Sequence, residues 1–129
     1  MRAADTNVVV RLLARDHPGQ HARATGFFRA GTVWIPITVI LETEWVLRSA
    51  YRSEPQQIAR LLRSLLSVPG IEVESAAAVS EALGWFEQGM DFADALHLAA
   101  ARRCDGLATF DRDFIKTAAR LGIANVTEP

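Results

Sequence analysis

The sequence has few of the features that would place it in an oxidising compartment, a membrane or a complex with a polyanion. Cys104 is the only cysteine among 129 residues, so no internal disulfide can form. No uncharged apolar run approaches the roughly 20 residues that a membrane span needs, and Asp5 lies where a signal peptide would have its apolar stretch. The formal net charge of −1 excludes a global basic field. We therefore expect a soluble cytoplasmic protein without a membrane partner.

The composition is that of an ordinary globular protein, with 50% hydrophobic and 22% charged residues. The length favours one domain over residues 1–129, and we find no internal repeat, low-complexity tract or linker. Of the 14 basic residues, only Lys116 is a lysine. Arginine suits bidentate phosphate contacts, although a genome of high GC content would produce the same bias.

Glycine and proline divide the chain into short strands that alternate with helices. We predict strands ending at Asp5 and over residues 33–36, 71–73, 107–109 and 124–127. Predicted helices cover residues 8–14, 38–51, 54–68, 75–88, 91–103 and 111–121, and a further helix after the break at His17-Pro18-Gly19 runs to about Arg29. Ser53 and Gln56 fit a capping box for the fourth helix. Strands alternating with helices indicate a parallel sheet covered on both faces, so the predicted fold class is α/β.

Several acidic residues fall where parallel strands end. Asp5 ends the first strand, Asp111 follows the strand at 107–109, and Asp91 and Asp94 begin a helix at the same edge. Asp91 and Asp111 also suit helix caps, and Asp94 suits the positive end of its helix, so both interpretations stay open. Converging carboxylates would repel by roughly 4 kcal/mol per close pair at an effective dielectric of 20. A hard divalent cation, Mg²⁺ or Mn²⁺, would relieve that repulsion.

A further acid comes from the helix at residues 38–51, where Glu42 and Glu44 compete. Glu44 has Arg48 four residues later, the favourable order for a surface ion pair. Glu42 is predicted on a largely apolar face with no nearby cation, where an unpaired carboxylate is unfavourable. We therefore favour Glu42 for the site, although Glu44 also borders apolar residues.

Four segments together resemble the PIN domain, and more narrowly the VapC-type toxins of toxin–antitoxin pairs. They are Asp5-Thr6-Asn7, Leu41-Glu42, Asp91-Phe92-Ala93-Asp94-Ala95-Leu96 and Thr109-Phe110-Asp111. The resemblance runs from the first residues to about Gly122. One departure is the opening strand, where Arg2, Ala3 and Ala4 replace bulkier apolar residues.

The resemblance implies a three-layer α/β/α sandwich whose central, mostly parallel sheet has about five strands in the order 3-2-1-4-5. It also implies a metal-dependent endoribonuclease that inhibits translation, with Mg²⁺ as cofactor, an RNA substrate, a homodimeric state and a cognate antitoxin. The implied catalytic metal ligands are Asp5, Glu42, Asp94 and Asp111. Asp91 and Asp113 are implied helpers for a second ion, and Thr6, Asn7 and Thr109 are implied supporting residues.

Other side chains have less specific interpretations. Candidates for RNA contact, each equally a solvated surface arginine, are Arg11, Arg15, Arg48, Arg52 and Arg112. His17 and His21 do not make a zinc pair, because Pro18 and Gly19 interrupt their helix and the glutamate of the zinc motif is missing. His97 lies one turn after Asp94 and is expected either at the pocket or on the surface. Cys104 is expected to be a small core residue.

Two rival functions remain. A phosphoacceptor receiver domain also clusters carboxylates around Mg²⁺, but it needs a lysine just after a late strand, and Lys116 falls within the last predicted helix. A PIN fold with an inactive site could serve as a binding module, against which the intact set of four acids argues. Whether a nuclease would cut single-stranded RNA, structured RNA or DNA is left open by the sequence.

Overall fold

A computed structural model describes all residues from Met1 to Pro129. The chain divides into two compact units, Met1–Ala76 and Ala77–Pro129, which are described separately. None of the helices is both long enough and apolar enough to cross a membrane. The expectation of a single domain over the whole chain stays a prediction.

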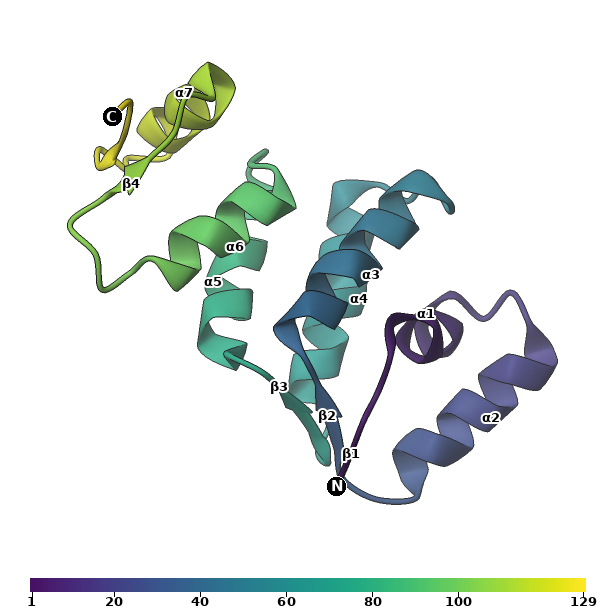
Figure 1. Ribbon diagram of the computed structural model, residues 1–129. Helices are drawn as coiled ribbons and strands as arrows, with labels where there is room; N and C mark the ends of the chain where they lie inside the picture. The colour runs from purple at the N-terminus through teal and green to yellow at the C-terminus, as the bar shows by residue number, and fades with distance from the viewer. The chain divides into compact units, whose positions relative to one another are not determined.

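The first unit contains a three-stranded parallel sheet in the order β1-β2-β3 (Figure 1). Its elements are β1 (Arg2–Ala3), α1 (Thr6–Ala14), α2 (Pro18–Arg29), β2 (Val33–Ile35), α3 (Ile37–Ser49), α4 (Pro55–Ser67) and β3 (Ile71–Val73). Arg2 is opposite Val33, and Val33 is opposite Ile71. Helix α1 packs against α2 and α3, α3 against α4, and α4 against β3.

The core of the first unit follows from helical spacing. On α4, Ile58, Leu62 and Leu65 recur at intervals of four and three residues and are fully buried. Ile40 and Leu47 of α3 are buried as well. Each such side chain contributes roughly 1.5–3 kcal/mol when it leaves water, so this apolar stripe holds α3 and α4 in place and thereby positions the acids of α3.

The second unit contains a parallel pair of strands and three helices. Its elements are α5 (Ala76–Glu87), α6 (Phe92–Ala100), β4 (Leu107–Ala108), α7 (Arg112–Arg120) and β5 (Val126–Thr127). Phe86 and Phe92 meet edge to face at 5.4 Å in the core between α5 and α6. Gly106 permits the approach of β5, because any Cβ there would lie 2.6 Å from the carbonyl oxygen of Asn125.

The predicted fold class is confirmed: parallel strands alternate with helices. The strand orders 3-2-1 and 4-5 are both present, each within its own unit. The adjacency of the first and fourth strands, and with it the three-layer sandwich around one five-stranded sheet, stays a prediction.

Two local predictions are wrong. The capping box at Ser53 does not form: α4 begins at Pro55, with Glu54 as an N-cap that makes no side-chain capping bond. The backbone N–H of Ser53 instead donates to the carbonyl of Leu47 at 3.0 Å, so Ser53 belongs to the turn that closes α3. Cys104 is exposed rather than part of the core, because it lies in the turn after α6.

Candidate functional site

In the first unit, Asp5 lies where β1 gives way to α1. It is the N-cap residue of α1, but its carboxylate makes no capping bond and has no hydrogen-bond or ion-pair partner. Asp5 and Asn7 are both exposed. An N-cap aspartate normally accepts a bond from the first turn, so the unused carboxylate of Asp5 is available to a ligand.

Thr6 links this segment to α3. Its side chain is buried, with 6% of its surface exposed, and its hydroxyl donates to Oε1 of Glu42 at 2.5 Å. The bond joins residues 36 positions apart in the sequence. It therefore holds the Glu42 carboxylate near the segment that carries Asp5 and Asn7, and the first unit brings together four of the predicted site residues.

Glu42 and Glu44 have the opposite burial from the one predicted. Glu42 is exposed, whereas the side chain of Glu44 is only 2% exposed. The predicted ion pair of Glu44 is present, since Nε of Arg48 donates to Oε2 of Glu44 at 2.8 Å, but it is buried on the glutamate side. Glu44 is thus a structural residue of α3. The prediction that Glu42 lies on an apolar, buried face was wrong. The bond from Thr6 is now the support for Glu42.

Glu74 is an acid that the sequence reasoning missed. It follows β3 directly, and its Oε1 accepts a bond from the backbone N–H of Ile37 at 2.9 Å. Ile37 is the first residue of α3, whose own N-cap is a proline and offers no side-chain acceptor. Glu74 therefore caps the helix that carries Glu42. Its position just after a strand was the signal that could have identified it.

In the second unit, four aspartates line one pocket of about 450 Å³: Asp91, Asp94, Asp111 and Asp113. The side chain of Asp91 caps α6 by accepting from the backbone N–H of Asp94 at 3.1 Å. Oδ1 of Asp111 caps α7 by accepting from the N–H groups of Asp113 and Phe114. The predicted capping roles of Asp91 and Asp111 are confirmed, and both residues face the same pocket nonetheless.

Asp94 has no such partner, and its surroundings disfavour its charge. Burial raises the pKa of the Asp94 carboxyl, and the neighbouring carboxylates of Asp91 and Asp111 raise it further. His97 acts weakly in the other direction and is itself exposed. The charged form of Asp94 is therefore held in an unfavourable field that a bound cation would reverse.

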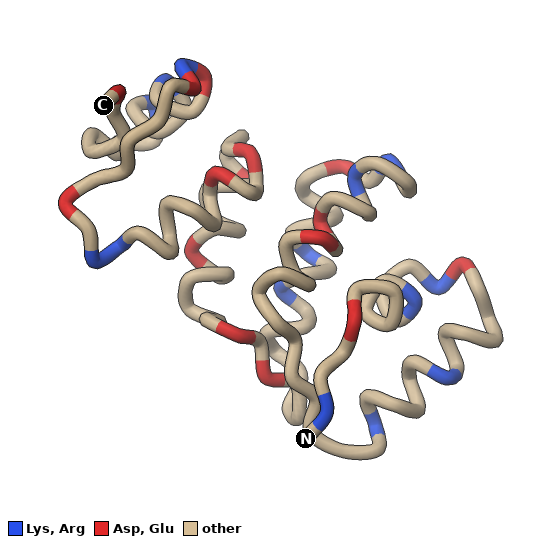
Figure 2. Tube along the Cα trace, in the orientation of Figure 1, with Lys and Arg blue, Asp and Glu red and all other residues tan.

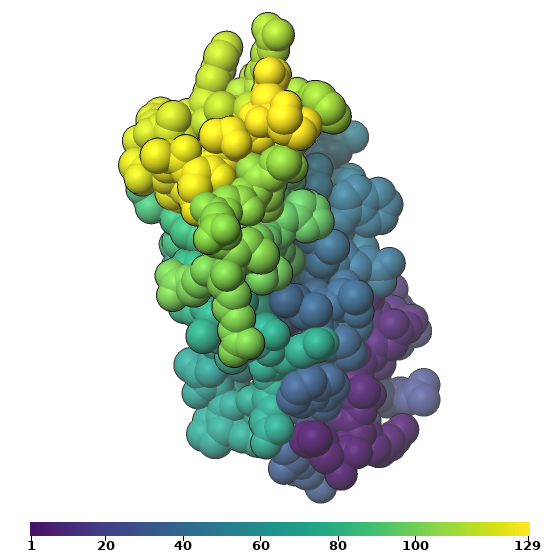
Figure 3. Space-filling view, turned by 60° about the vertical axis from the view of Figure 1, so that its left-hand side comes forward, coloured from purple at the N-terminus to yellow at the C-terminus, as the bar shows by residue number.

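In the segment between β4 and α7, Thr109 is half-buried and Phe110 and Asp111 are exposed. Figure 3 shows a face of the molecule on which the C-terminal part of the chain, from green to yellow, lies at the surface. The hydroxyl of Thr109 accepts a bond from the backbone N–H of Asp111 at 3.0 Å, which fixes the start of α7. Phe110 is 81% exposed, and the side chain of Arg112 is 83% exposed with only a 3.8 Å ion pair to Glu128. An exposed aromatic and an exposed arginine thus flank Asp111.

The donor atoms of the second unit's pocket are those of a hard-cation site. The second unit's pocket offers carboxylate oxygens and no histidine or cysteine, which suits Mg²⁺ or Mn²⁺ rather than zinc. No three histidine, cysteine or acidic side chains are already arranged to hold an ion. The chemistry of the donors therefore fits a hard cation, although the side chains are not preset at coordinating distance.

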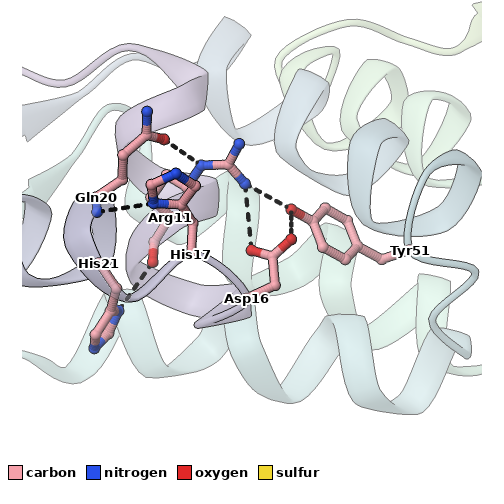
Figure 4. Close-up of polar contacts among 6 residues, drawn as sticks. All are labelled: Arg11, Asp16, His17, Gln20, His21 and Tyr51. Carbon is pink, nitrogen blue, oxygen red and sulfur yellow. Dashed lines mark hydrogen bonds and ion pairs between the residues drawn. The ribbon is translucent and has the colours of Figure 1, made fainter.

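Arg11 is engaged in a structural network rather than available to a ligand (Figure 4). Its guanidinium donates to Gln20, to Asp16 at 3.3 Å and to the hydroxyl of Tyr51 at 3.0 Å. That hydroxyl donates in turn to Asp16 at 2.9 Å. The network ties α1 to α2 and to the end of α3, so the interpretation of Arg11 as an RNA contact loses support.

The two histidines of this region are also used locally (Figure 4). Nδ1 of His17 accepts from the backbone N–H of Gln20 at 3.1 Å and caps α2. Nδ1 of His21 lies 2.9 Å from the carbonyl oxygen of Arg11. Nδ1 of each histidine is therefore engaged in a contact within the first unit.

The chain is similar to one known protein family. The model of the family described as PIN domain matches residues 3–120. Neither the comparison with curated proteins nor the one with solved structures gives a match. Because the family model covers most of the 129 residues, the chain belongs to the PIN domain family, whose members are typically nucleases and generally use divalent metals.

Proposed function

We propose that this chain is a metal-dependent endoribonuclease that hydrolyses RNA phosphodiester bonds. In this proposal Asp5, Glu42, Asp94 and Asp111 are metal ligands, directly or through water. The observation that carries it is the pocket of the second unit, which four aspartates line. Among them, the Asp94 carboxyl has no hydrogen-bond partner, and its surroundings raise its pKa and so disfavour its charged form. Such a cluster is unfavourable unless a cation compensates it. Membership of the PIN domain family supports the nuclease activity.

The cofactor proposed is Mg²⁺, for which Mn²⁺ can substitute. When bound, such an ion lowers the pKa of a coordinated water and neutralises charge on the scissile phosphate. Asp91 and Asp113 line the same pocket as Asp94 and Asp111, and we propose that they help to hold a second ion.

The protein's own part is to fix its acids before substrate arrives. Thr6 orients Glu42 through its hydroxyl, and Thr109 fixes the backbone of Asp111. Loss of a hydrogen bond that orients a metal ligand typically lowers metal affinity or activity by about 10-fold to 100-fold. Asn7, the residue after Thr6, is exposed, and we propose that it contacts the substrate.

The test of the nuclease is cleavage of a labelled single-stranded RNA with Mn²⁺ by the wild-type protein and by Asp5→Asn and Asp94→Asn. Both variants should lose about 100-fold of the rate or more. Asp105→Asn is the matched control, because Asp105 is exposed and its side chain has no partner. Undiminished cleavage by pure Asp5→Asn contradicts its assignment, and absence of wild-type cleavage contradicts the proposed activity.

We further infer a VapC-type toxin role, with RNA as substrate, a cognate antitoxin as protein partner and a homodimer as the working state. The support is the succession of the four motifs named above. Expression of the wild-type chain should arrest growth and that of Asp94→Asn should not. A short reading frame directly upstream that encodes a DNA-binding protein would support the pairing, and light scattering of the purified protein would test the dimer.

A second candidate is a PIN-fold binding module without activity. Two observations favour it: Asp91 and Asp111 both act as helix caps, and no three acids are already arranged around an ion. Titration calorimetry with Mn²⁺ distinguishes the two, because an inactive module predicts no binding that depends on Asp94.

A further inference from the structure

Two arginines without a hydrogen bond or an ion pair, Arg2 and Arg23, line a pocket of about 720 Å³ in the first unit. The pocket is bordered by β1, the start of α1 and one face of α2, and the residues that matter here are Arg2, Asp5, Asn7, Arg11, Arg23 and Phe27. Its volume is in the range of ordinary ligand sites, roughly 300–1,000 Å³. We refer to it as the Arg2–Arg23 pocket.

The charges in this pocket are not balanced within the protein. Asp5 is the only acid that lines it. Arg11 is engaged by Asp16, but neither Arg2 nor Arg23 has a hydrogen bond or an ion pair with any residue of the chain. Helix α2 carries two arginines and no acid (Figure 2). The pocket therefore presents two guanidinium groups whose donors are all available.

The contact of Arg2 with Phe27 and the position of Arg23 one turn before Phe27 on α2 bring the two arginines to the same region of the pocket. Phe27 follows Arg23 by four residues on α2, so the two side chains share a helix face. The guanidinium of Arg2 lies over the ring of Phe27, at 5.0 Å from its centroid. The ring orders Arg2 within about one helical turn of Arg23, where the two like charges repel unless an anion lies between them.

We propose that the Arg2–Arg23 pocket binds the phosphate backbone of single-stranded RNA on its way to Asp5. Arginine forks match phosphate oxygens in bidentate fashion, and Asp5 and Asn7 line the same pocket, so a strand held by Arg2 and Arg23 lies beside a proposed metal ligand. The inference rests on the proposed nuclease function and names the surface that holds its substrate. It replaces Arg11, which is engaged by Asp16, with Arg2 and Arg23, which were not among the arginines predicted to contact RNA.

The same feature explains how an acidic site can hold a polyanion. Asp5 and Asn7 line the same pocket as Arg2 of β1 and Arg23 of α2. Each phosphate contact to a single strand contributes about −0.7 to the slope of log K against log salt concentration. Two contacts therefore predict a contribution of about −1.4 to that slope.

The experiment measures binding separately from cleavage. Fluorescence anisotropy follows a short fluorescein-labelled single-stranded RNA titrated with protein in the Asp94→Asn background and in EDTA, over about 50–200 mM salt. The Arg2→Gln/Arg23→Gln variant should bind about 10-fold more weakly and lose about 1.4 of the salt slope. Arg60→Gln is the matched control, because Arg60 is exposed on α4 without an ion pair. It should change neither quantity.

A conservative variant keeps the test informative if the double substitution disturbs folding. Arg2→Lys/Arg23→Lys retains both charges, so it should keep most of the salt slope while losing the bidentate part of the affinity. The proposal is overturned if the double glutamine variant, folded by its melting curve, binds RNA with the affinity and slope of Arg60→Gln. It is also overturned if an acidic peptide needs both arginines for binding while RNA does not, which would indicate a protein partner.

The failures of the two proposals are distinguishable. If Arg2→Gln/Arg23→Gln leaves metal-dependent cleavage unaffected, the proposed nuclease activity is supported and the proposed RNA-binding pocket is refuted. RNA binding that depends on both arginines, in a wild-type protein that never cleaves, leaves the pocket standing and removes the nuclease.

Discussion

Replacing Asp94 by asparagine should stabilise the metal-free protein. The Asp94 carboxylate is partly buried and lies near the carboxylates of Asp91 and Asp111, and these effects together raise its pKa. Asparagine has nearly the same shape and carries no charge. The variant therefore removes an unfavourable interaction from the pocket without leaving a cavity.

The magnitude follows from two opposing effects. Each like-charged, part-exposed neighbour destabilises the Asp94 carboxylate by about 0.2–0.5 kcal/mol. Partial desolvation adds to this, so the total free energy that disfavours the charge is roughly 1–1.5 kcal/mol. Asp94 lies in the first turn of α6, where the helix N-terminus favours an anion by about 0.3–1 kcal/mol. The net gain lies between about 0 and 1.2 kcal/mol, with a midpoint of about 0.6 kcal/mol, which corresponds to an increase in Tm of about 2 °C for a chain of this size.

The pH dependence gives an independent check of the cause. Because the pKa of Asp94 is raised in the folded state, the protonated carboxyl favours the folded protein. This contribution to the free energy of unfolding is fully present below the ordinary pKa of 3.8, and it is lost as pH rises through the raised pKa. The advantage of Asp94→Asn should therefore be present at neutral pH and absent in strong acid. It should also shrink at high salt, because part of the repulsion is screened.

The assay is calorimetric or fluorescence melting with and without Mg²⁺. Mg²⁺ at about 100 times its Kd should stabilise the wild-type protein by about 2.7 kcal/mol. The Asp94→Asn variant should lose most of that stabilisation. Asp105→Asn, in the same unit, controls for the loss of one negative charge. A variant that is less stable than the wild-type protein without metal, or that keeps the full effect of Mg²⁺, refutes the reasoning.

Three further predictions concern the first unit. Thr6→Val should lower cleavage about 10-fold to 100-fold by releasing Glu42, while Thr6→Ser keeps the rate; equal rates in kinetic assays would remove the orienting role. Glu44→Gln should lower the free energy of unfolding by about 1–3 kcal/mol in denaturant titrations, because it weakens a buried bond to Arg48; an unchanged midpoint would contradict this. Tyr51→Phe should cost about 1 kcal/mol. Because burial and the bond to a carboxylate raise the pKa of Tyr51, wild-type stability should fall as pH rises above 10.0, and the variant's should not.

The fold was largely predictable because its signals are local. The apolar stripe of α4 and the run of Val79, Leu83 and Phe86 on α5 are helical periods, and all of these positions are buried. The aspartates Asp91 and Asp111 begin α6 and α7 as their capping chemistry predicts. Such features depend on neighbours in the sequence, which is why periodicity and capping rules identified them.

The polar contacts of the site were less predictable because they join distant segments. The bond from Thr6 to Glu42 spans 36 residues, and the cap that Glu74 provides to Ile37 spans 37. Helical spacing on α3 could not decide which of Glu42 and Glu44 is buried, since both border apolar side chains. The burial of Glu44 follows from the packing of α3 in three dimensions, and sequence spacing alone assigned it to the wrong glutamate.

The proposed nuclease requires that the aspartates of the second unit's pocket form a cation site on which cleavage depends. The most direct measurement is Mn²⁺ binding followed by the electron paramagnetic resonance signal of the unbound ion, with the wild-type protein, Asp94→Asn and Asp105→Asn compared side by side. The wild-type protein and Asp105→Asn should bind Mn²⁺ with the same affinity, and Asp94→Asn should bind it at least about 10-fold more weakly. Equal binding by all three proteins, or binding by none, would contradict it.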